Sequence, residues 1–256
     1  MVRKKIKPII VIGGSDPSGG AGIQADLSAL TALGVPAFSV ITAVTAQDEK
    51  RFFSYECVSL KTFRDQLKGV QGQTRGTVVK IGMLGSGRLI PALIAWLKAA
   101  KPSFVIVDPV LRSSTGRDLL DEEGRRLLEK KLLPLADLVT PNVREAEILS
   151  GRRIQSQTEL EEAGTILRRK GCGAVLIKGG HLPGAPVDVL FSHGKIRRFS
   201  GRRLRRKDVH GTGCTLASSI AGGLALGRSL VRSIDLGRRQ VLKKIRAAAA
   251  APSHSK

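Results

Sequence analysis

Short apolar runs alternate with longer amphipathic stretches along most of the chain. The runs are rich in β-branched residues and occupy residues 8–12, 38–44, 78–81, 104–107, 137–139 and 174–177. Near-continuous hydrophobicity of this length is typical of strands that are covered on both faces. Patterns with helical spacing lie between and after them, at residues 23–33, 90–99, 122–132, 159–169, 213–226 and 229–251. This alternation predicts right-handed crossovers and one mostly parallel, doubly wound α/β sheet with helices on both faces.

Local signals add detail to this outline. Val187–Phe191 and Lys195–Phe199 flank a His-Gly turn and predict a β-hairpin, placed at a sheet edge or used as a flap. Thr158 and Glu161 have the spacing of a capping box at the start of the 159–169 helix. No Ser/Pro-rich linker interrupts the chain, so we expect one domain over residues 1–256, with a frayed tail at 247–256.

Composition excludes several classes of protein. Of 256 residues, 42% are hydrophobic and 25% charged, which argues against a disordered chain. No apolar run approaches the roughly 18 residues of a membrane-spanning helix. Cys57, Cys172 and Cys214 lie far apart with no Cys-x-x-Cys pair, so neither a disulfide framework nor a zinc knuckle is expected. A cytoplasmic location follows as the expectation.

A formal net charge of +22 attracts polyanions whatever the fold. Specific readers of nucleic acid also carry interleaved aromatic residues or a basic recognition element, and aromatic residues make up only 4% here. The densest basic stretch, Lys195–Lys207, is interpreted as a solvated face of the hairpin. We therefore expect nucleic-acid binding to be non-specific if it occurs, and phosphate-bearing small substrates are the alternative use of this charge.

The first of two glycine-rich segments, Gly13–Gly22, follows the first strand and opens a helix. Bare backbone and unpaired N–H groups at such a place let a ligand approach closely. The segment lacks both the Gly-x-Gly-x-x-Gly pattern of dinucleotide sites and the Gly-Lys-Ser/Thr of a P-loop. A phosphate site of another kind and a plain strand-to-helix turn both remain open.

The second segment, His210–Thr215, alternates glycines with small hydroxyl residues at a helix start. This pattern makes a nest of backbone N–H groups suited to an anion that gains charge in a transition state. Cys214 is expected in the first turn, where the helix dipole favours the thiolate and lowers the pKa. The alternative is a small buried cysteine that packs a glycine-rich helix.

Three charged residues follow strands that should be parallel. Asp108 closes one strand, Glu145 follows the next, and Lys178 ends a third. Ligand sites of open α/β sheets collect at the carboxyl ends of the strands. Two carboxylates there can hold Mg²⁺ through its waters and bridge to phosphates, although each residue alone could be a cap or a salt-bridge partner.

The segment Gly14–Asp26 (Gly-Ser-Asp-Pro-Ser-Gly-Gly-Ala-Gly-Ile-Gln-Ala-Asp) resembles the N-terminal signature of the hydroxymethylpyrimidine/phosphomethylpyrimidine kinases. These enzymes of thiamin biosynthesis belong to the ribokinase-like superfamily. Further matches come in family order, at residues 39–47, 80–84, 108–110, 140–146, 171–181 and 210–216. The resemblance covers residues 8 to 227, and its first and last motifs together are highly specific.

The resemblance implies a ribokinase-like fold and an ATP- and Mg²⁺-dependent kinase. Its substrates would be 4-amino-5-hydroxymethyl-2-methylpyrimidine and then the monophosphate of that alcohol, which becomes the diphosphate. A homodimer is also implied, because relatives commonly dimerise. Two rivals stay open: a pyridoxal kinase of the same superfamily, and a nucleic-acid-binding protein on a degenerate kinase scaffold.

Site residues follow from the same resemblance, position by position. Asp26 and Gln47 match positions that hydrogen-bond the pyrimidine, Met83 and Val110 match positions that wall the ring, and Gly14 joins this substrate side. The catalytic positions are Cys214, as base, and the anion hole formed by Gly211, Thr212 and Gly213. Asn142, Lys178 and His210 match the ATP side, and Asp108 and Glu145 match the magnesium-linked carboxylates.

Overall fold

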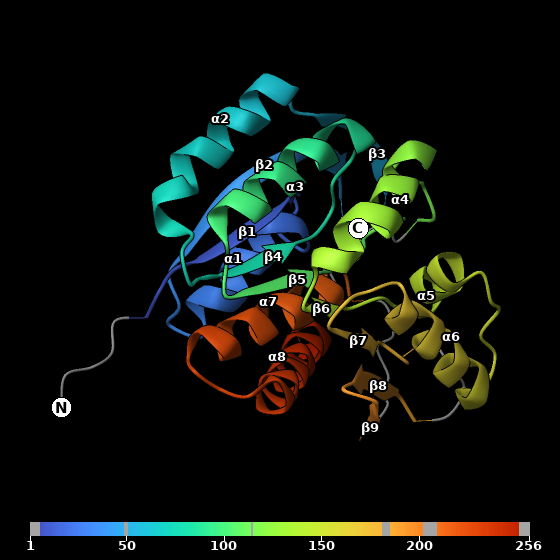
Figure 1. Cartoon of the computed structure of the whole chain (residues 1–256). Coiled ribbons are helices and arrows are strands. Elements are labelled where there is room, and N and C mark those ends of the chain that lie inside the picture. Colours follow the sequence, from blue (N-terminus) through green and yellow to red (C-terminus); the bar gives the residue numbers. More distant parts are fainter. Residues whose placement is uncertain (1–5, 49–50, 114, 181–184, 202–208, 251–256) are drawn as a thin grey trace.

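The structure, a computed structural model, describes residues 6–48, 51–113, 115–180, 185–201 and 209–250. The strands are β1 Ile9–Ser15, β2 Ala37–Gln47, β3 Phe52–Cys57, β4 Val78–Ile81, β5 Phe104–Val107, β6 Leu138–Val139, β7 Ala174–Ile177, β8 Val187–Ser192 and β9 Lys195–Ser200. The α-helices are α1 Gly22–Thr31, α2 Leu60–Val70, α3 Ile90–Ala100, α4 Glu122–Leu127, α5 Val143–Ser150, α6 Gln157–Arg169, α7 Thr212–Ala225 and α8 Leu230–Ala250. Figure 1 shows their arrangement.

All the strands belong to one sheet with the order β3-β2-β1-β4-β5-β6-β7-β8-β9. Neighbouring strands in the central stretch β2-β1-β4-β5-β6-β7 pair in parallel. The edge strand β3 is antiparallel to β2, and at the other edge β8 is antiparallel to both β7 and β9. The predicted doubly wound α/β sheet is confirmed, and the predicted hairpin lies at the sheet edge.

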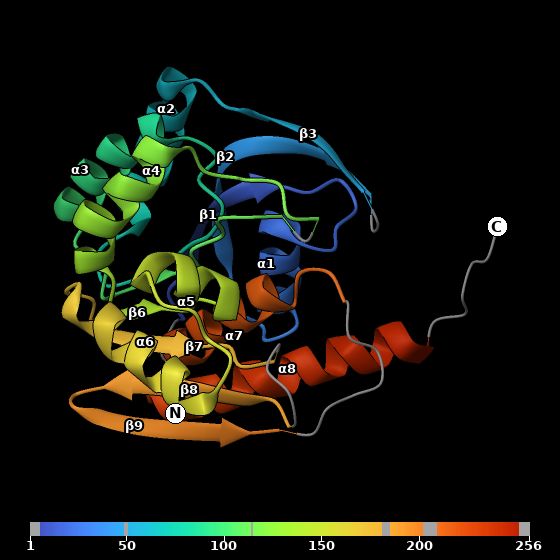
Figure 2. The ribbon, with the colours of Figure 1, turned by 90° about the vertical axis from the view of Figure 1, so that its right-hand side faces the viewer.

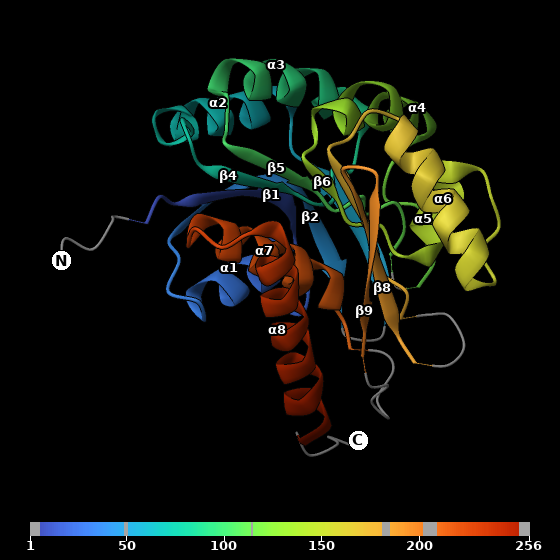
Figure 3. The ribbon, with the colours of Figure 1, turned by 60° about the horizontal axis from the view of Figure 1, so that its bottom comes forward.

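Two layers of helices cover the sheet, as Figure 3 shows. On one face α2 to α6 bury a core that includes Phe63, Leu93 and Leu160. On the other face α1, α7 and α8 bury a second core that includes Leu30 and Ile220. Because both faces are covered, β1 and β4 are buried almost throughout, which explains their continuous apolar runs.

Most of the expected helices are present with ends shifted by one or two residues, but the predicted helix 122–132 is α-helical only over Glu122–Leu127 and continues as a π-helical turn at Leu128–Leu132. Helix α6 begins two residues earlier than predicted, because the capping box is formed by Ser156 and Glu159. The expected box of Thr158 and Glu161 is therefore wrong, since both residues lie inside the helix. Helix α8 is regular through Ala250, so residues 247–250 of the expected frayed tail are helical, and residues 251–256 lie outside the description.

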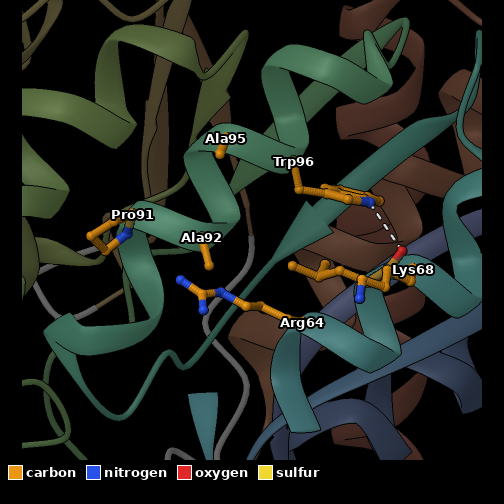
Figure 4. A pocket seen from close by; sticks show the side chains of 7 residues that line it. Arg64, Lys68, Pro91, Ala92, Ala95 and Trp96 are labelled. Atoms are coloured by element: carbon orange, nitrogen blue, oxygen red, sulfur yellow. Dashed lines mark hydrogen bonds between the residues drawn. The ribbon is translucent and has the colours of Figure 1, made fainter. Parts of the chain in front are cut away.

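A groove lies between α2 and α3 on the outer surface (Figure 4). Its volume is about 340 Å³, and it is lined mainly by carbon atoms of Arg64, Leu67, Pro91 and Trp96. The Trp96 indole donates to the Leu67 carbonyl oxygen at 3.1 Å, which fixes the ring in this wall. The groove lies on the helix layer rather than at the ends of the strands.

No helix in the described part of the chain is long and apolar enough to cross a membrane.

Candidate active site

The sequence-predicted site residues gather where the parallel strands end. The segments after β1, β5 and β7 contact the N-terminus of α7 at this edge, and the segment after β6 pairs with the one after β7. Figure 2 shows the same sheet and α7 in a view turned by 90°. The convergence follows from parallel pairing, which brings all carboxyl ends to one side of the sheet. His181 and residues 202–208, which resemble or precede family motifs, lie outside the described residues.

Asp16 organises the first glycine-rich segment. Its buried carboxylate accepts hydrogen bonds from the backbone N–H of Ser18 at 2.9 Å and of Ala21 at 2.7 Å. The Nε2 atom of His210 lies 3.1 Å from the same carboxylate, which ties this segment to the second one. Burial opposes ionisation, but the hydrogen bond from the Ser18 hydroxyl at 2.8 Å, the two backbone hydrogen bonds and His210 outweigh it and lower the pKa of Asp16. The sequence reasoning did not single out Asp16, although a Ser-Asp-Pro turn was a visible signal.

The two glycine-rich segments touch at Gly211 and Gly20. Gly211 has φ +74°, and a Cβ atom built there would lie 1.8 Å from the Gly20 carbonyl oxygen. A Cβ built on Gly20 would in turn lie 2.8 Å from Cδ2 of His210. The Gly211 contact is with backbone, so that position requires glycine, whereas a side chain at Gly20 would have to displace the His210 ring.

The family resemblance implies phosphoryl transfer, and we expect Gly211→Ala to reduce this activity by about a hundredfold or more, because the clash must push the nest away from Gly20. The left-handed backbone conformation adds roughly 1 kcal/mol of strain. Gly227→Ala is the matched control: Gly227 has φ +78° with no atom within 4 Å of a built Cβ. Steady-state kinetics of the two variants separates backbone strain from the clash, and equal activities would contradict this account.

Cys214 lies in the first turn of α7, as expected, but its acidity is opposite to the expectation. Burial raises the pKa of the Cys214 thiol to about 11, although nearby Lys80 acts in the other direction. The predicted lowering by the helix dipole is therefore wrong for the free protein. Desolvation of a thiolate among buried carboxylates outweighs the partial charge of one helix end.

Asp108 and Lys178 form a charged pair beside the nest. The Lys178 ammonium donates to Asp108 at 2.8 Å, and the Thr140 hydroxyl donates to the same carboxylate oxygen at 3.0 Å. Burial disfavours the carboxylate, but Lys178, Lys80 and these hydrogen bonds lower the pKa of Asp108. A Cβ on Gly213 would lie 3.3 Å from the Lys178 Nζ and 3.6 Å from Asp108, so the pair directly contacts the start of α7.

Glu145 and Asn142 form a capping box at the start of α5. Asn142 accepts from the Glu145 N–H at 2.9 Å, while the Glu145 carboxylate accepts from the Asn142 N–H at 2.7 Å. Glu145 is also 3.9 Å from the Lys178 Nζ. Burial and the charge of Asp108 outweigh Lys178 and raise the pKa of Glu145 to about 7. The first turn of α5 thus gives both residues a structural role besides the predicted one.

The donor set suits Mg²⁺ held mainly through water and phosphate. Within the described residues no group of three or more His, Cys, Asp or Glu side chains could hold a metal ion by itself. Asp108 and Glu145 are both buried carboxylates within reach of Lys178, so they lie on one small part of the strand-end edge. Mg²⁺ commonly uses one or two carboxylates together with substrate phosphates, so these two residues fit it.

An apolar cluster forms next to the glycine-rich segments. Met83 belongs to its buried part, and the partly buried Val110, Phe52 and Tyr55 pack against it. That Met83 and Val110 wall the pyrimidine ring stays a prediction. A Cβ on Gly14 would lie 2.9 Å from the Met83 Sδ, so glycine there lets Met83 approach the backbone. The aromatic residues were missed because the sequence pattern did not predict β3.

Two predicted substrate residues are engaged within the protein. Gln47 donates to Thr45 at 2.9 Å, beside the bulge that ends β2. Asp26 is fully buried and accepts from Lys80 at 2.8 Å and from Ser218 at 2.7 Å. Burial alone lowers the pKa of Lys80, but Asp26, Cys214 and Asp108 together raise it above its ordinary value. Direct contact of Asp26 and Gln47 with substrate stays a prediction. Lys80 is a missed charged residue whose signal was a lysine inside a four-residue apolar strand.

Solved structures with this architecture define the class of protein. A phosphomethylpyrimidine kinase from Clostridium difficile 630 superposes with a TM-score of 0.82 at 37% identity, covering 93% of this chain and 99% of that one. A pyridoxal kinase from Staphylococcus aureus in complex with AMP-PCP gives 0.84 at 29% identity, covering 92% and 86%. The fold is that of the ribokinase-like small-molecule kinases.

The sequence comparisons narrow this class to one family. The family model described as phosphomethylpyrimidine kinase matches residues 16–255, and the chain belongs to this family of phosphotransferases. A hydroxymethylpyrimidine/phosphomethylpyrimidine kinase from Rhizobium meliloti is 39% identical over 93% of this chain and 90% of its own length. The thiamine biosynthesis bifunctional protein ThiED of Geobacter sulfurreducens is 42% identical over 94% of this chain. The chain spans about half of that relative's length, 49%.

Proposed function

We propose that the chain phosphorylates 4-amino-5-hydroxymethyl-2-methylpyrimidine with ATP and then converts the monophosphate to the diphosphate. The observation that carries the proposal is the contact of the His210–Thr215 nest with the Lys178–Asp108 pair, next to the apolar cluster around Met83. One part of the site suits phosphate and the adjoining part suits a small flat ring. Family membership supports the same substrates.

Phosphoryl transfer depends mainly on positioning and charge stabilisation. We assign the backbone N–H groups of Gly211, Thr212 and Gly213 to the transferred phosphoryl group, and Lys178 to the phosphates of ATP. Asn142 and His210 flank the same nucleotide side. Asp108 and Glu145 would hold Mg²⁺, which supplies charge neutralisation between the phosphates when bound.

The two steps differ in their need for a base. In the first step the substrate alcohol attacks the γ-phosphorus, the bond to the ADP oxygen breaks, and the hydroxyl proton must leave. We assign that proton to Cys214. In the second step the nucleophile is an anionic phosphate oxygen, which has no proton to lose at neutral pH. The assignment therefore concerns the first step alone.

Cys214→Ser is expected to slow the first step by about a hundredfold and the second by less than about threefold, since a serine hydroxyl is a far poorer proton acceptor. Each step is measured separately, with the alcohol or the monophosphate as the starting substrate. Because the pKa of Cys214 is about 11, a thiolate base also predicts a first-step rate that rises tenfold per pH unit below that value. Equal losses in both steps would leave Cys214 with a positioning role only.

The direct test of the proposed function is product formation resolved by phosphate number. The protein is incubated with ATP and Mg²⁺ and, in parallel, with hydroxymethylpyrimidine, its monophosphate or pyridoxal, and the products are separated by chromatography. Conversion of both pyrimidines supports the proposal. If neither pyrimidine is converted, the proposal is contradicted.

Pyridoxal phosphorylation is the second candidate function. Several of the matched structures are pyridoxal kinases, including that of Staphylococcus aureus with AMP-PCP and pyridoxal, which superposes with a TM-score of 0.85 at 28% identity. Residues 48–52 are Asp-Glu-Lys-Arg-Phe, where the family that the chain resembles usually has Asn-Thr-x-Gly-Val. Phe52 of this segment packs against the apolar cluster. Turnover of pyridoxal alone would move the function to vitamin B6 salvage while keeping the mechanism.

The assembly and location of the protein are part of the proposal. Phe38, Val44 and Phe53 expose large apolar side chains on the β2–β3 edge of the sheet, which supports a homodimer formed through that edge. Cys57, Cys172 and Cys214 are all free thiols, which supports a reducing compartment such as the cytoplasm.

A further inference from the structure

Lys244 of α8 reaches the candidate site from a helix that no sequence motif connected with it. Figure 3 shows α8 lying against α7, with its C-terminal half extending beyond the body of the molecule. The half-buried Lys244 ammonium donates to the Gly20 carbonyl oxygen at 2.6 Å and to the Thr215 hydroxyl at 3.4 Å. Its neighbour Lys243 is exposed.

The contacts of Lys244 join the two glycine-rich segments. Gly211 lies so close to the Gly20 carbonyl oxygen that a side chain at position 211 would clash with it. Thr215 follows Cys214 directly, and its hydroxyl donates to the Gly211 carbonyl oxygen at 3.0 Å. One ammonium thus bonds to the first segment and to the first turn of α7, at the place where the two meet.

The charge of Lys244 is uncompensated at close range. Both of its hydrogen-bond partners are neutral, and no carboxylate of the described residues forms an ion pair with it. Burial lowers the pKa of Lys244, and Cys214, Asp16 and Asp26 oppose this only in part. Asp16 and Asp26 are themselves bound by His210 and by Lys80, respectively. A partly buried ammonium without a counterion raises the local potential for an anion bound nearby.

We propose that Lys244 is a positioning residue of the anion hole, which holds Gly20 against Gly211 and adds a positive charge beside Thr215. The added charge favours the phosphoryl group during transfer more than it favours either bound substrate. The inference rests on the proposed function for its kinetic consequence, whereas its electrostatic consequence belongs to the free protein.

The kinetic consequence is tested with Lys244→Met, which keeps the length of the side chain and removes its charge and donors. We expect kcat to fall tenfold to a hundredfold, on the order of the loss of one oxyanion-hole donor, with KM for ATP and pyrimidine changed by less than about threefold. Lys244→Arg should recover part of kcat, and Lys243→Met should match the wild type. An unchanged kcat in Lys244→Met, or a loss confined to KM, would overturn the proposal.

The electrostatic consequence is tested by alkylating Cys214 in the absence of substrates. Iodoacetate is anionic and iodoacetamide is neutral, and both react with the same thiolate. The rate with iodoacetate divided by the rate with iodoacetamide therefore rises with the positive potential at Cys214. Mass spectrometry of the tryptic peptide 208–228 isolates Cys214 from the other two cysteines. Lys244→Met should lower the ratio by about threefold, while Lys244→Arg and Lys243→Met should preserve it.

A merely structural role for Lys244 would change both alkylation rates alike and leave their ratio constant, which would overturn the charge component of the proposal. The alkylation test needs no turnover. If Lys244→Met shifts the ratio but the wild-type protein phosphorylates neither pyrimidine, the charge role of Lys244 is supported and the proposed function is rejected. If the ratio is constant and the protein is an active kinase, the proposed function is supported and the charge role of Lys244 is rejected.

Discussion

Replacing Lys178 with methionine is expected to lower phosphoryl transfer by about a thousandfold or more, since the variant loses the cation that contacts both carboxylates and the start of α7. Lys178 is 15% exposed and pairs with Asp108, which is 2% exposed. Removing one partner of a buried pair also costs about 3–5 kcal/mol in the free energy of unfolding. Single-turnover transfer from labelled ATP and urea unfolding measure the two effects.

Lys170→Met is the matched control for this variant. Lys170 pairs with Glu129 at 2.6 Å, and both side chains are 28% exposed. Lys170 precedes β7 and so lies at the amino end of that strand, away from the carboxyl ends that form the site. Such a pair contributes about 1 kcal/mol or less, and its loss should leave transfer unchanged. If Lys178→Met kept most of its activity while losing the expected free energy of unfolding, Lys178 would have a structural role only.

The parts of the fold that could be predicted are those fixed by local pattern. Continuous apolar runs identified the parallel strands, because burial on both faces removes the polar positions. β3 was missed because it is a half-exposed antiparallel edge strand whose place depends on pairing with β2. Helix α2 was also missed, although its N-cap Ser59 and the helical spacing of Phe63, Leu67 and Val70 were visible in the sequence.

The candidate site shows the same division between local and spatial information. Glycine segments and strand-end charges were predictable, since parallel strands bring their carboxyl ends together. The acidity of Cys214 was not, because the argument from the helix dipole considers one helix, whereas burial depends on everything packed around it. Contacts between distant segments, such as Lys244 with Gly20, likewise need the folded chain.

The buried Asp26–Lys80 pair is expected to have a large effect on the stability of the fold. Both side chains are 1% exposed, and the ammonium lies 2.8 Å from each carboxylate oxygen. Lys80→Met leaves the Asp26 carboxylate buried with Ser218 as its remaining side-chain donor among the residues that the structure describes, so we expect a loss of about 3–5 kcal/mol in the free energy of unfolding at pH 7. Urea unfolding at constant m-value gives the number.

The double variant Asp26→Asn/Lys80→Met should regain a large part of this loss, because a neutral amide with Ser218 beside it costs far less to bury than an unpaired carboxylate. The exposed pair of Lys61 and Asp65, with Lys61 89% exposed, supplies the control: Lys61→Met should change stability by less than about 1 kcal/mol. A double variant as unstable as Lys80→Met would mean that lost packing, rather than an unpaired charge, is the cause. Burial raises the pKa of Asp26 in spite of Lys80 and Ser218, so burial itself disfavours the charged carboxylate. Asp26 in turn raises the pKa of Lys80 against the effect of burial, so the ammonium contributes its full stabilisation below its ordinary pKa and loses it as the pH rises through the raised value.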